Sequence, residues 1–471
     1  MKLLLFGALC TLTIAVPAPA QQVPNGAADI PISGRDRFYS ADQFSNTVSV
    51  IDPSTERLLG VIRLGDPTPG NLSPLYRGQL LVHGAGFSPY RKTLAIVSIG
   101  SNSVTFIDTA TNRVKHTTYI GRSPHEAFFR PDGRELWVTV RGENYISVID
   151  PKTFRETGRI TVPNGPGMTI FSPDGKYGYV CSSFSPETVV ISTRSKKIVG
   201  RVKQASPFCP NIAATPDGKQ VWLTLKDVGK IMVFDARPPF KVLRTIDTGP
   251  ITNHVNIARN RNGQFAYVTV GAENAVKVFR TSDFAQVATI PVGELPHGLW
   301  PSGDGTRMYV GLENADAVAV IDTLANRVIA TIPIGQGPQA VVYVPGAVPA
   351  GGGTTNLMPL GQAAGKVQLT LAGTGRSEVT LFDQGQVQVL QAAVSGLAPK
   401  TSYVLGLSKR ADGKGLQPIA KFMTGPSGSA VVNSVGPLRE IVSGPSRDER
   451  RYLAIAAGDP AAIGAIVQVQ Q

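Results

Sequence analysis

A short segment in which two apolar residues usually precede Asp recurs seven times, and no other feature of this sequence restricts the fold so strongly. The segments end at Asp52, Asp108, Asp150, Ser192, Asp235, Arg280 and Asp322. The first interval is 56 residues long, and the other five lie between 42 and 45 residues. Each unit holds short apolar stretches separated by turn signals such as Pro131-Asp132-Gly133. Four antiparallel strands in about 40 residues form one blade of a β-propeller, so the sequence predicts seven blades.

The two ends of the repeat array predict that the propeller closes into a ring. The first unit begins near Arg37 without its first strand, and one extra strand, residues 339–344, follows the seventh unit. If this strand completes the first blade, no sheet edge stays open to pair with another chain. We therefore expect an all-β protein with a seven-bladed β-propeller over residues 36–345.

The first 20 residues have the features of a signal peptide. Lys2 precedes the apolar run 3–16, and Ala18-Pro19-Ala20 resembles a cleavage site. The run is too short for a helix that spans a membrane, which needs about 20 apolar residues. We expect no membrane span, a flexible leader over residues 21–35, and a mature protein that is periplasmic or secreted.

The composition changes after the propeller. Residues 346–365 are rich in Gly and Pro, which is typical of a linker. Residues 366–471 contain short alternating apolar stretches, such as 367–371 and 403–407, without the period of the propeller units. Antiparallel strands in a segment of this length fit a small β-sandwich-like domain, with a barrel as the other option.

Cysteine content and charge bear on the compartment and the partners. Removal of the signal peptide leaves two cysteines, Cys181 and Cys209, which form a candidate disulfide in an oxidising compartment. The formal net charge of +13 favours anionic partners such as nucleic acid or anionic polymers. The basic residues are scattered along the chain, so the charge is a weak indication of a nucleic-acid site.

The repeat units resemble the YVTN family of β-propeller repeats, of the exported bacterial type. The family's unit runs from Pro-Asp-Gly through a Tyr-Val-Thr-Asn strand to a Val-Ser-Val-Ile-Asp strand and an Ile-Pro-Val-Gly ending. Matching segments here are Pro173-Asp174-Gly175, Pro216-Asp217-Gly218, Tyr267-Val268-Thr269-Val270 and Ile290-Pro291-Val292-Gly293. The resemblance covers residues 36–345 and implies a seven-bladed propeller. It implies no single function, because propellers occur in binding proteins as well as enzymes.

Four of the five histidines fall at nearly one position of the repeat. His83, His125 and His297 stand eight residues before the turn Gly or its equivalent, and His254 stands nine before it. Gln339 takes this position in the closing strand. The first strand of each blade lines the central channel, so these residues should surround the channel mouth. The imidazoles are candidate ligands for Cu, Zn or a haem iron. The alternative is a repeat feature in which each ring bonds to a neighbouring backbone.

Three Glu-Asn pairs lie in loops that open on the same face of the propeller. They are Glu143-Asn144, Glu273-Asn274 and Glu313-Asn314, in units three, six and seven. Carboxylates near imidazoles can orient them or act as a general base. Asn is also a common turn residue, so a structural role is the alternative. Because the same units carry His, we include these six residues among the candidate ligand-binding residues.

These features lead to two hypotheses about function. The first is an exported binding or scaffold protein that uses the face with His, Glu and Asn to bind a partner protein, an envelope polymer or a small ligand. The second is an enzyme with a histidine site at the channel mouth, either a metal- or haem-dependent oxidoreductase or a lactonase- or lyase-like protein. The sequence contains no Gly-x-Ser-x-Gly, phosphate-binding or EF-hand motif and identifies no catalytic residue.

Overall fold

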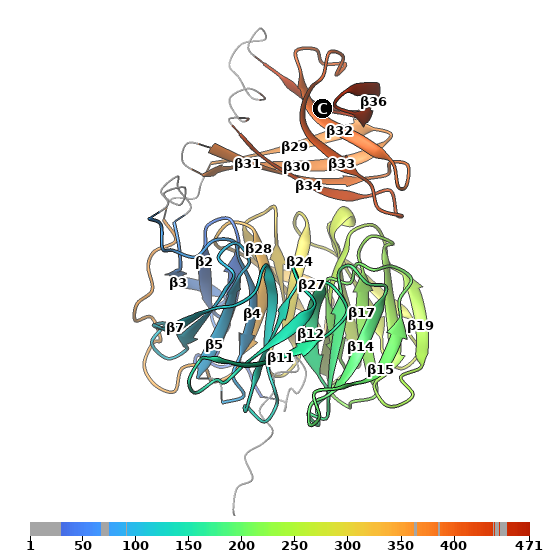
Figure 1. Ribbon diagram of the computed structural model, residues 1–471. Coiled ribbons are helices and arrows are strands. Elements are labelled where there is room, and N and C mark those ends of the chain that lie inside the picture. Colours follow the sequence, from blue (N-terminus) through green and yellow to red (C-terminus); the bar gives the residue numbers. More distant parts are fainter. Residues whose placement is uncertain are drawn as a thin grey trace, which may run out of the picture.

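The computed structural model describes residues 30–66, 75–90, 92–361, 365–384, 387–436, 438, 442 and 450–471. The expected signal peptide and most of the expected leader lie outside these residues. Over the described part, seven four-stranded antiparallel sheets surround a central channel, and a separate antiparallel β domain follows them (Figure 1). The predicted all-β fold with a seven-bladed propeller is thus confirmed. No helix in the described part is long and apolar enough to cross a membrane.

Each blade runs from an inner strand beside the channel to an outer strand at the rim. Blade 1 contains β28 (Pro338–Val344), β1 (Arg37–Asp42), β2 (Thr47–Asp52) and β3 (Arg57–Arg63). Blade 2 contains β4 (Val82–Phe87), β5 (Thr93–Ser98), β6 (Ser103–Asp108) and β7 (Val114–Tyr119). Blade 3 contains β8 (Pro124–Phe129), β9 (Leu136–Val140), β10 (Tyr145–Ile149) and β11 (Glu156–Thr161). Blade 4 contains β12 (Pro166–Phe171), β13 (Tyr177–Ser182), β14 (Glu187–Ser192) and β15 (Ile198–Lys203).

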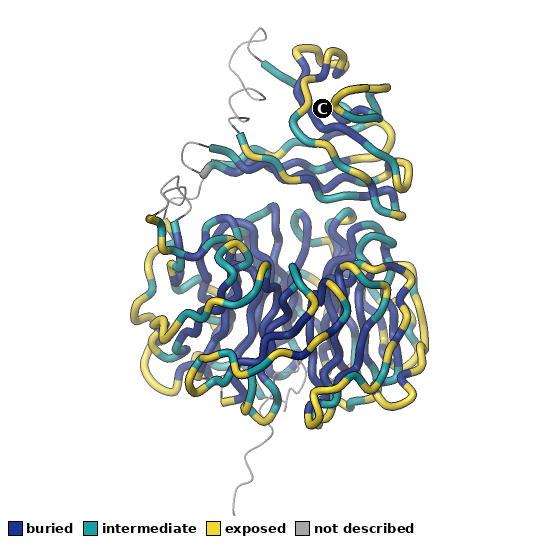
Figure 2. The backbone as a smooth tube through the Cα atoms, viewed as in Figure 1, coloured by how far each residue is buried: buried dark blue, intermediate teal, exposed yellow. Residues whose placement is uncertain are grey.

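The remaining three blades have the same order. Blade 5 contains β16 (Ile212–Ala214), β17 (Gln220–Leu225), β18 (Lys230–Asp235) and β19 (Val242–Asp247). Blade 6 contains β20 (Thr252–Asn260), β21 (Gly263–Val270), the short 3₁₀ turn η2 (Gly271–Glu273), β22 (Ala275–Arg280) and β23 (Gln286–Pro291). Blade 7 contains β24 (Pro296–Pro301), β25 (Arg307–Leu312), β26 (Ala317–Asp322) and β27 (Arg327–Pro333). The inner and middle strands are buried, whereas most of the exposed strand residues lie in the outer strands (Figure 2).

The ring closes as the ends of the repeat array predict. The last propeller strand, β28, pairs antiparallel with β1, so that Tyr39 lies opposite Val342 and Phe38 opposite Tyr343. The N-terminal and C-terminal ends of the repeat array therefore share one sheet. This pairing satisfies the hydrogen-bonding groups that an open first blade would expose.

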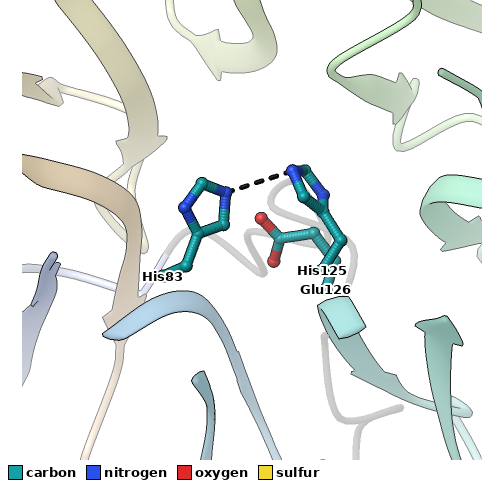
Figure 3. Close-up of side chains that lie close together, drawn as sticks. All are labelled: His83, His125 and Glu126. Atoms are coloured by element: carbon teal, nitrogen blue, oxygen red, sulfur yellow. Dashed lines mark hydrogen bonds between the residues drawn. The ribbon is translucent and has the colours of Figure 1, made fainter. Parts of the chain in front are cut away.

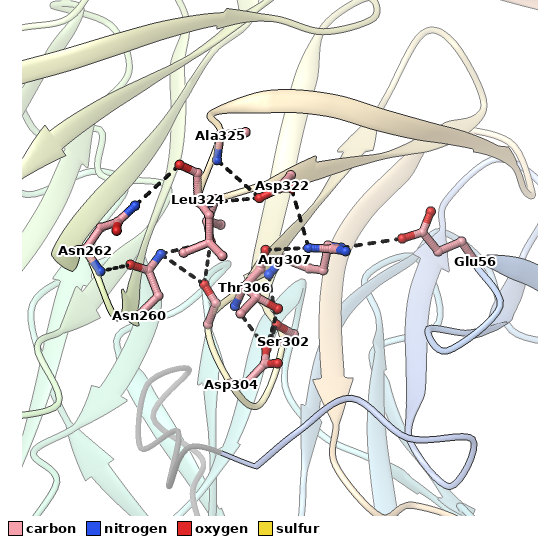
Figure 4. Close-up of polar contacts among 12 residues, drawn as sticks. Glu56, Asn260, Asn262, Ser302, Asp304, Thr306, Arg307, Asp322, Leu324 and Ala325 are labelled. Carbon is pink, nitrogen blue, oxygen red and sulfur yellow. Dashed lines mark hydrogen bonds and ion pairs between the residues drawn. The ribbon is translucent and has the colours of Figure 1, made fainter.

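Aspartates fix the turns on the propeller face that is farther from the histidines. Asp322 accepts hydrogen bonds from two backbone N–H groups of its turn (Figure 4). Asp304 accepts one from the backbone N–H of Thr306. Arg307 forms ion pairs with Glu56, at 3.6 Å, and with Asp322, at 3.9 Å. The first of these ion pairs joins blade 7 to blade 1. These contacts explain the recurrent Asp of the repeat as a turn residue.

Threonines near the end of the second strand link neighbouring blades beside the channel. The hydroxyls of Thr139, Thr224 and Thr269 donate hydrogen bonds of 2.8–2.9 Å to backbone carbonyls in the inner strand of the next blade. The same hydroxyls accept a backbone N–H of their own blade, from Glu126 in β8, from Asn211 directly before β16 and from His254 in β20. Each of the three threonines is fully buried. This repeated bond fixes the inner strands relative to one another.

The segment expected to be a linker packs against the propeller. The backbone of Met358 exchanges two hydrogen bonds with Val61 of β3, at 2.8 and 2.9 Å. Asn112 donates hydrogen bonds to the carbonyls of Gly353 and Thr355. The Gly- and Pro-rich segment therefore runs along the outside of blades 1 and 2, from the end of β28 to the opposite face of the propeller.

The C-terminal domain is one eight-stranded antiparallel sheet. In spatial order its strands are β33 (Gln417–Met423), β32 (Ser402–Ser408), β35 (Tyr452–Asp459), β36 (Ala462–Gln470), β29 (Lys366–Gly373), β30 (Gly375–Gln384), β31 (Val387–Ser395) and β34 (Ala430–Gly436). The end strands β33 and β34 lie beside each other, so the sheet is a nearly closed barrel. Of the two expected arrangements, it is closer to the barrel. Its core includes Leu381, Leu390, Leu405 and Ile455, which are fully buried.

Candidate functional site

The four channel histidines lie in β-bulges near the start of the inner strands. In β4, β8, β20 and β24, two bulged residues oppose a single residue of the second strand. A bulge changes the direction in which a side chain points. His83, His125 and His297 are the first of the two bulged residues, and His254 is the second. The second bulged residue stands seven residues before the turn Gly in blades 3 and 7 but nine before it in blade 6, so the longer hairpin of blade 6 sets the sequence position of His254.

The four imidazoles converge at one end of the channel. All four residues are buried, with 5–7% of their surface exposed. His83 Nε2 lies 3.1 Å from His125 Nε2 (Figure 3). The ring centroids are 4.6 Å apart for His83 and His125, 4.4 Å for His254 and His297, and 6.4 Å for His83 and His297. The structure thus brings two pairs of imidazoles into one cluster, which we call the imidazole cluster.

Carbonyl groups set the tautomers of three of these rings. His125 Nδ1 lies 2.8 Å from the carbonyl oxygen of Gly167, and His297 Nδ1 lies 3.3 Å from that of Gln339. His83 Nδ1 lies 2.8 Å from Oε1 of Gln43. A carbonyl oxygen only accepts hydrogen bonds, so Nδ1 of His125 and of His297 carries the proton, and Nδ1 of His83 does so with the Gln43 amide oriented as it is here. The Nε2 atoms of these rings then present lone pairs, as in histidines that bind metals.

Burial keeps the cluster uncharged. It lowers the pKa of His83, His125 and His254 well below the usual value, and it also lowers the pKa of His297. Neighbouring imidazoles and cationic side chains act in the same direction on the first three. At neutral pH the rings are therefore neutral, which is the state that binds metal ions.

A small cavity extends from the cluster into the channel. It is lined by Glu126, Met168, Asn211, His254 and Trp300, among others, and its volume is about 20 Å³. This space suffices for one ion or water molecule. Burial raises the pKa of Glu126 to about 8, and its carboxylate accepts the backbone N–H of Ala85 at 3.2 Å. Glu126 is not among the residues predicted from the sequence, although it follows His125 directly and shares its bulge.

A second set of residues occupies one equivalent position in each blade, on the propeller face that carries the cluster. These are the residues that directly follow the second strand of each blade: Gln43, Ile99, Arg141, Ser183, Lys226, Gly271 and Glu313. We call them the mouth positions. They share one position of the repeat register, whereas the Glu-Asn pairs predicted from the sequence mostly lie two residues farther along the loops.

The acidic residues of two Glu-Asn pairs make local contacts outside the cluster. Glu143 accepts the backbone N–H of Arg122 at 2.7 Å. Glu273 forms an ion pair of 2.8 Å with Lys277. These contacts hold the loops of blades 3 and 6 and leave the two carboxylates engaged there.

The amide residues of the predicted set behave similarly. Asn144 is exposed. Asn274 takes the left-handed conformation, with φ of 49°, and accepts the backbone N–H of Leu295 at 3.0 Å. Gln339 is buried, but its side chain contacts the carbonyl of Gly337 at 3.5 Å, and its backbone carbonyl faces His297. Asn274 and Gln339 therefore support the frame of the site, whereas Asn144 lies at the surface.

The third pair, Glu313-Asn314, lies at the junction with the C-terminal domain. Glu313 is buried and accepts a hydrogen bond of 2.6 Å from Gln391 of β31. Its negative charge favours the protonated forms of His297 and Lys226. Asn314 is fully buried, and neither of its side-chain polar atoms has a hydrogen-bond partner within the described residues.

The C-terminal domain covers part of the propeller face that carries the cluster (Figure 1). Phe44 of blade 1 packs with Phe382 and Val389, and Ala393 packs in a second apolar contact between the domains. Further bonds are Gln368 to Glu294 at 2.5 Å, Lys366 to the carbonyl of Ala315 at 2.9 Å, and Ser427 N–H to the carbonyl of Asp227 at 2.9 Å. In the described part of the chain, these joining contacts involve blades 5, 6, 7 and 1 and not blades 2 to 4.

The structure joins Cys181 and Cys209 as a disulfide. Cys181 stands at the position in β13 that Thr139, Thr224 and Thr269 occupy in their blades. Cys209 lies in the connection to the inner strand of blade 5. The disulfide therefore takes the place of the hydrogen bond by which these threonines link neighbouring blades.

Comparisons with known proteins agree on the fold. No protein-family model and no curated protein matches the chain. The structure is similar to Kuenenia stuttgartiensis hydrazine synthase, with a TM-score of 0.50 and 22% identity over 58% of this chain and 94% of that one. It is also similar to a functionally unknown protein from Desulfotomaculum acetoxidans, with a TM-score of 0.52 and 14% identity over 64% of this chain and 99% of that one. At these identities the likeness shows the propeller fold alone.

Proposed function

We propose that this protein binds one transition-metal ion, copper or zinc, at the imidazole cluster. The observation that supports this most directly is the 3.1 Å separation of the Nε2 atoms of His83 and His125. Their Nδ1 hydrogen bonds leave a lone pair on both Nε2 atoms, and two lone pairs at this distance repel each other. A proton or a metal cation between them would remove the repulsion. The lowered pKa values disfavour the proton.

The donor set suits Cu or Zn. Zn²⁺ binds imidazole nitrogen at about 2.0–2.1 Å, so two nitrogens on one tetrahedral ion lie about 3.3 Å apart. One ligand atom from each of His83, His125 and Glu126 lies within 4.8 Å of the others. His254 and His297 provide further imidazoles beside them. Imidazole-rich sites favour Cu and Zn over Mg or Ca.

A haem, the third cofactor considered from the sequence, does not fit this space. Sites for ligands of that size enclose roughly 300–1,000 Å³, whereas the cavity beside the cluster measures about 20 Å³. The C-terminal domain also contacts the face on which the histidines lie. We therefore propose a small ligand, a metal ion, in preference to a partner protein or an envelope polymer bound at this face. An exported location is part of the proposal and agrees with the disulfide.

Metal analysis of the full-length protein tests the proposal. After treatment with a chelator, the protein is loaded with Cu²⁺ or Zn²⁺, passed through a desalting column and analysed by inductively coupled plasma mass spectrometry. We expect one tightly held ion per chain in the wild type and its loss in the double variant His83→Ala/His125→Ala. The variant His116→Ala is the matched control, because His116 lies in the outer strand β7 and stacks on Phe154. Equal metal content in all three proteins, or none in the wild type, would refute the proposal.

A further inference from the structure

The mouth positions differ in charge from one side of the channel to the other. Blades 3, 4 and 5 supply Arg141, Ser183 and Lys226. In blades 4 and 5 the position that carries a histidine elsewhere is occupied by Gly167 and Pro210. The channel mouth therefore has imidazoles on one side and hydrogen-bond donors, two of them cationic, on the other.

The two cations lack acidic partners. Among the described residues, neither Arg141 nor Lys226 forms an ion pair, although both are half-buried. The Nε atom of Arg141 is buried and has no hydrogen-bond partner there, and the same holds for the hydroxyl of Ser183. Burying charged or polar groups without partners is unfavourable. Blades 3 and 4 thus each present an unsatisfied donor, and blade 5 adds a cation without an acidic partner among the described residues.

An aromatic side chain separates and orients the cations. The Arg141 guanidinium carbon lies 5.5 Å from the ring centroid of Phe208, and Lys226 Nζ lies 6.0 Å from the same centroid. Arg141 also lies 5.7 Å from the ring of Phe184, which is 55% exposed. Contacts of this kind hold cations in place without neutralising them. None of these contacts supplies an opposite charge to Arg141 or Lys226.

The opposite charge nearby does not balance the two cations. Glu313 is the acidic mouth residue, and it already accepts a hydrogen bond from Gln391. Arg141 and Lys226 contribute two positive charges and Glu313 one negative charge. A net positive charge in a partly enclosed site attracts anions, and the planar guanidinium matches the geometry of an oxyanion.

We propose that the space between the imidazole cluster and Arg141, Ser183 and Lys226 binds a small oxyanion, either an inorganic anion such as phosphate or sulfate or a small carboxylate. The anion accepts hydrogen bonds from the guanidinium, the hydroxyl and the ammonium group. It enters over blades 2 to 4, where no described contact with the C-terminal domain closes the face. This site goes beyond the proposed metal site and does not require the metal, because its donors are different residues.

Isothermal titration calorimetry at constant ionic strength tests the proposal, with phosphate, sulfate, acetate and succinate as separate probes. We expect one anion per chain and an affinity that falls at least about tenfold in Arg141→Gln and in Lys226→Gln. The matched control is Arg159→Gln, which removes the same charge from an exposed side chain in β11 of blade 3. Binding of phosphate and sulfate alone identifies an inorganic oxyanion, and binding of acetate or succinate alone identifies a carboxylate.

The result that overturns the proposal is the absence of binding of all four probes to the wild type, or equal affinity in wild type, Arg141→Gln and Lys226→Gln. Thermal unfolding of each variant without anion checks that it is folded, and Arg141→Lys, which keeps the charge, should retain part of the affinity. The titrations are made on chelator-treated and on metal-loaded protein. If the protein binds an anion but retains no metal after loading, the metal proposal alone is refuted. If it retains the metal but binds no anion, this inference alone is refuted.

Discussion

The disulfide between Cys181 and Cys209 offers a quantitative test of how the blades are held together. It closes a loop with a sequence separation of 28 residues. In the chain-entropy account, a cross-link over a loop of this length stabilises the folded state by about 3.6 kcal/mol at 25 °C, because it restricts the unfolded chain. We expect the double variant Cys181→Ala/Cys209→Ala to lose about this amount of unfolding free energy.

The threonines at the equivalent position provide a second, sharper comparison. In blades 3, 5 and 6 a threonine hydroxyl links its blade to the next by a hydrogen bond. The variant Cys181→Thr/Cys209→Ala should regain this bond, which contributes about 0.5–1.5 kcal/mol. It should therefore be more stable than Cys181→Ala/Cys209→Ala and less stable than the oxidised wild type.

Urea unfolding followed by tryptophan fluorescence measures these differences, since Trp137 and Trp222 are buried in the propeller. Each protein is measured with and without a reducing agent. Reduction should lower the midpoint of the wild type to near that of the alanine double variant and leave both double variants unchanged. A wild-type midpoint that does not respond to reduction, or a threonine variant no more stable than the alanine variant, would contradict the reasoning.

Three further predictions concern residues that position the site. Gln43→Ala should weaken metal binding about 10- to 100-fold, because Nδ1 of His83 loses its hydrogen-bond acceptor. Gln43→Glu still accepts the Nδ1 proton and should retain metal binding. A metal titration of both variants distinguishes the two outcomes. Thr269→Val leaves the N–H of His254 and the carbonyl of His297 without their bonds, so unfolding free energy should fall by roughly 2–4 kcal/mol, with Thr269→Ser near wild type. Burial raises the pKa of Asp42 to about 7, above the usual value of about 4. The folded state therefore favours the protonated form of Asp42. This contributes unfolding free energy on the order of 4 kcal/mol, which is fully present below about pH 4 and is lost as the pH rises to about 7. Asp42→Asn should flatten the dependence of stability on pH over this range, and an unchanged profile would contradict the assignment.

Much of the architecture could be predicted because the repeat carries the same pattern in every unit. The turn signals and alternating apolar residues predict four strands per blade, and the surplus strand at residues 339–344 predicts the closure that β28 and β1 make. The repeat register also places His83, His125 and His297 at one position of the inner strand. Their convergence follows from ring geometry, since equivalent positions of successive blades lie around one axis.

The loops were harder to interpret. Glu143 and Glu273 lie in the predicted loops but bond locally, because a turn can satisfy a carboxylate with its own backbone or with a neighbouring lysine. Arg141, two residues before Glu143, reaches the mouth instead. Which residue of a turn points toward the axis depends on turn geometry, and the repeat spacing does not contain that information.

The sequence by itself determined that this chain is a closed seven-bladed ring with imidazoles near its axis, because strand alternation and a fixed period are local properties. The tertiary structure alone decided that bulges bring His83 Nε2 and His125 Nε2 to 3.1 Å. It also decided that two cations face them and that the chain's own barrel covers part of the same face. Those outcomes depend on packing between segments far apart in the chain, such as Gln391 against Glu313, and no local pattern specifies them.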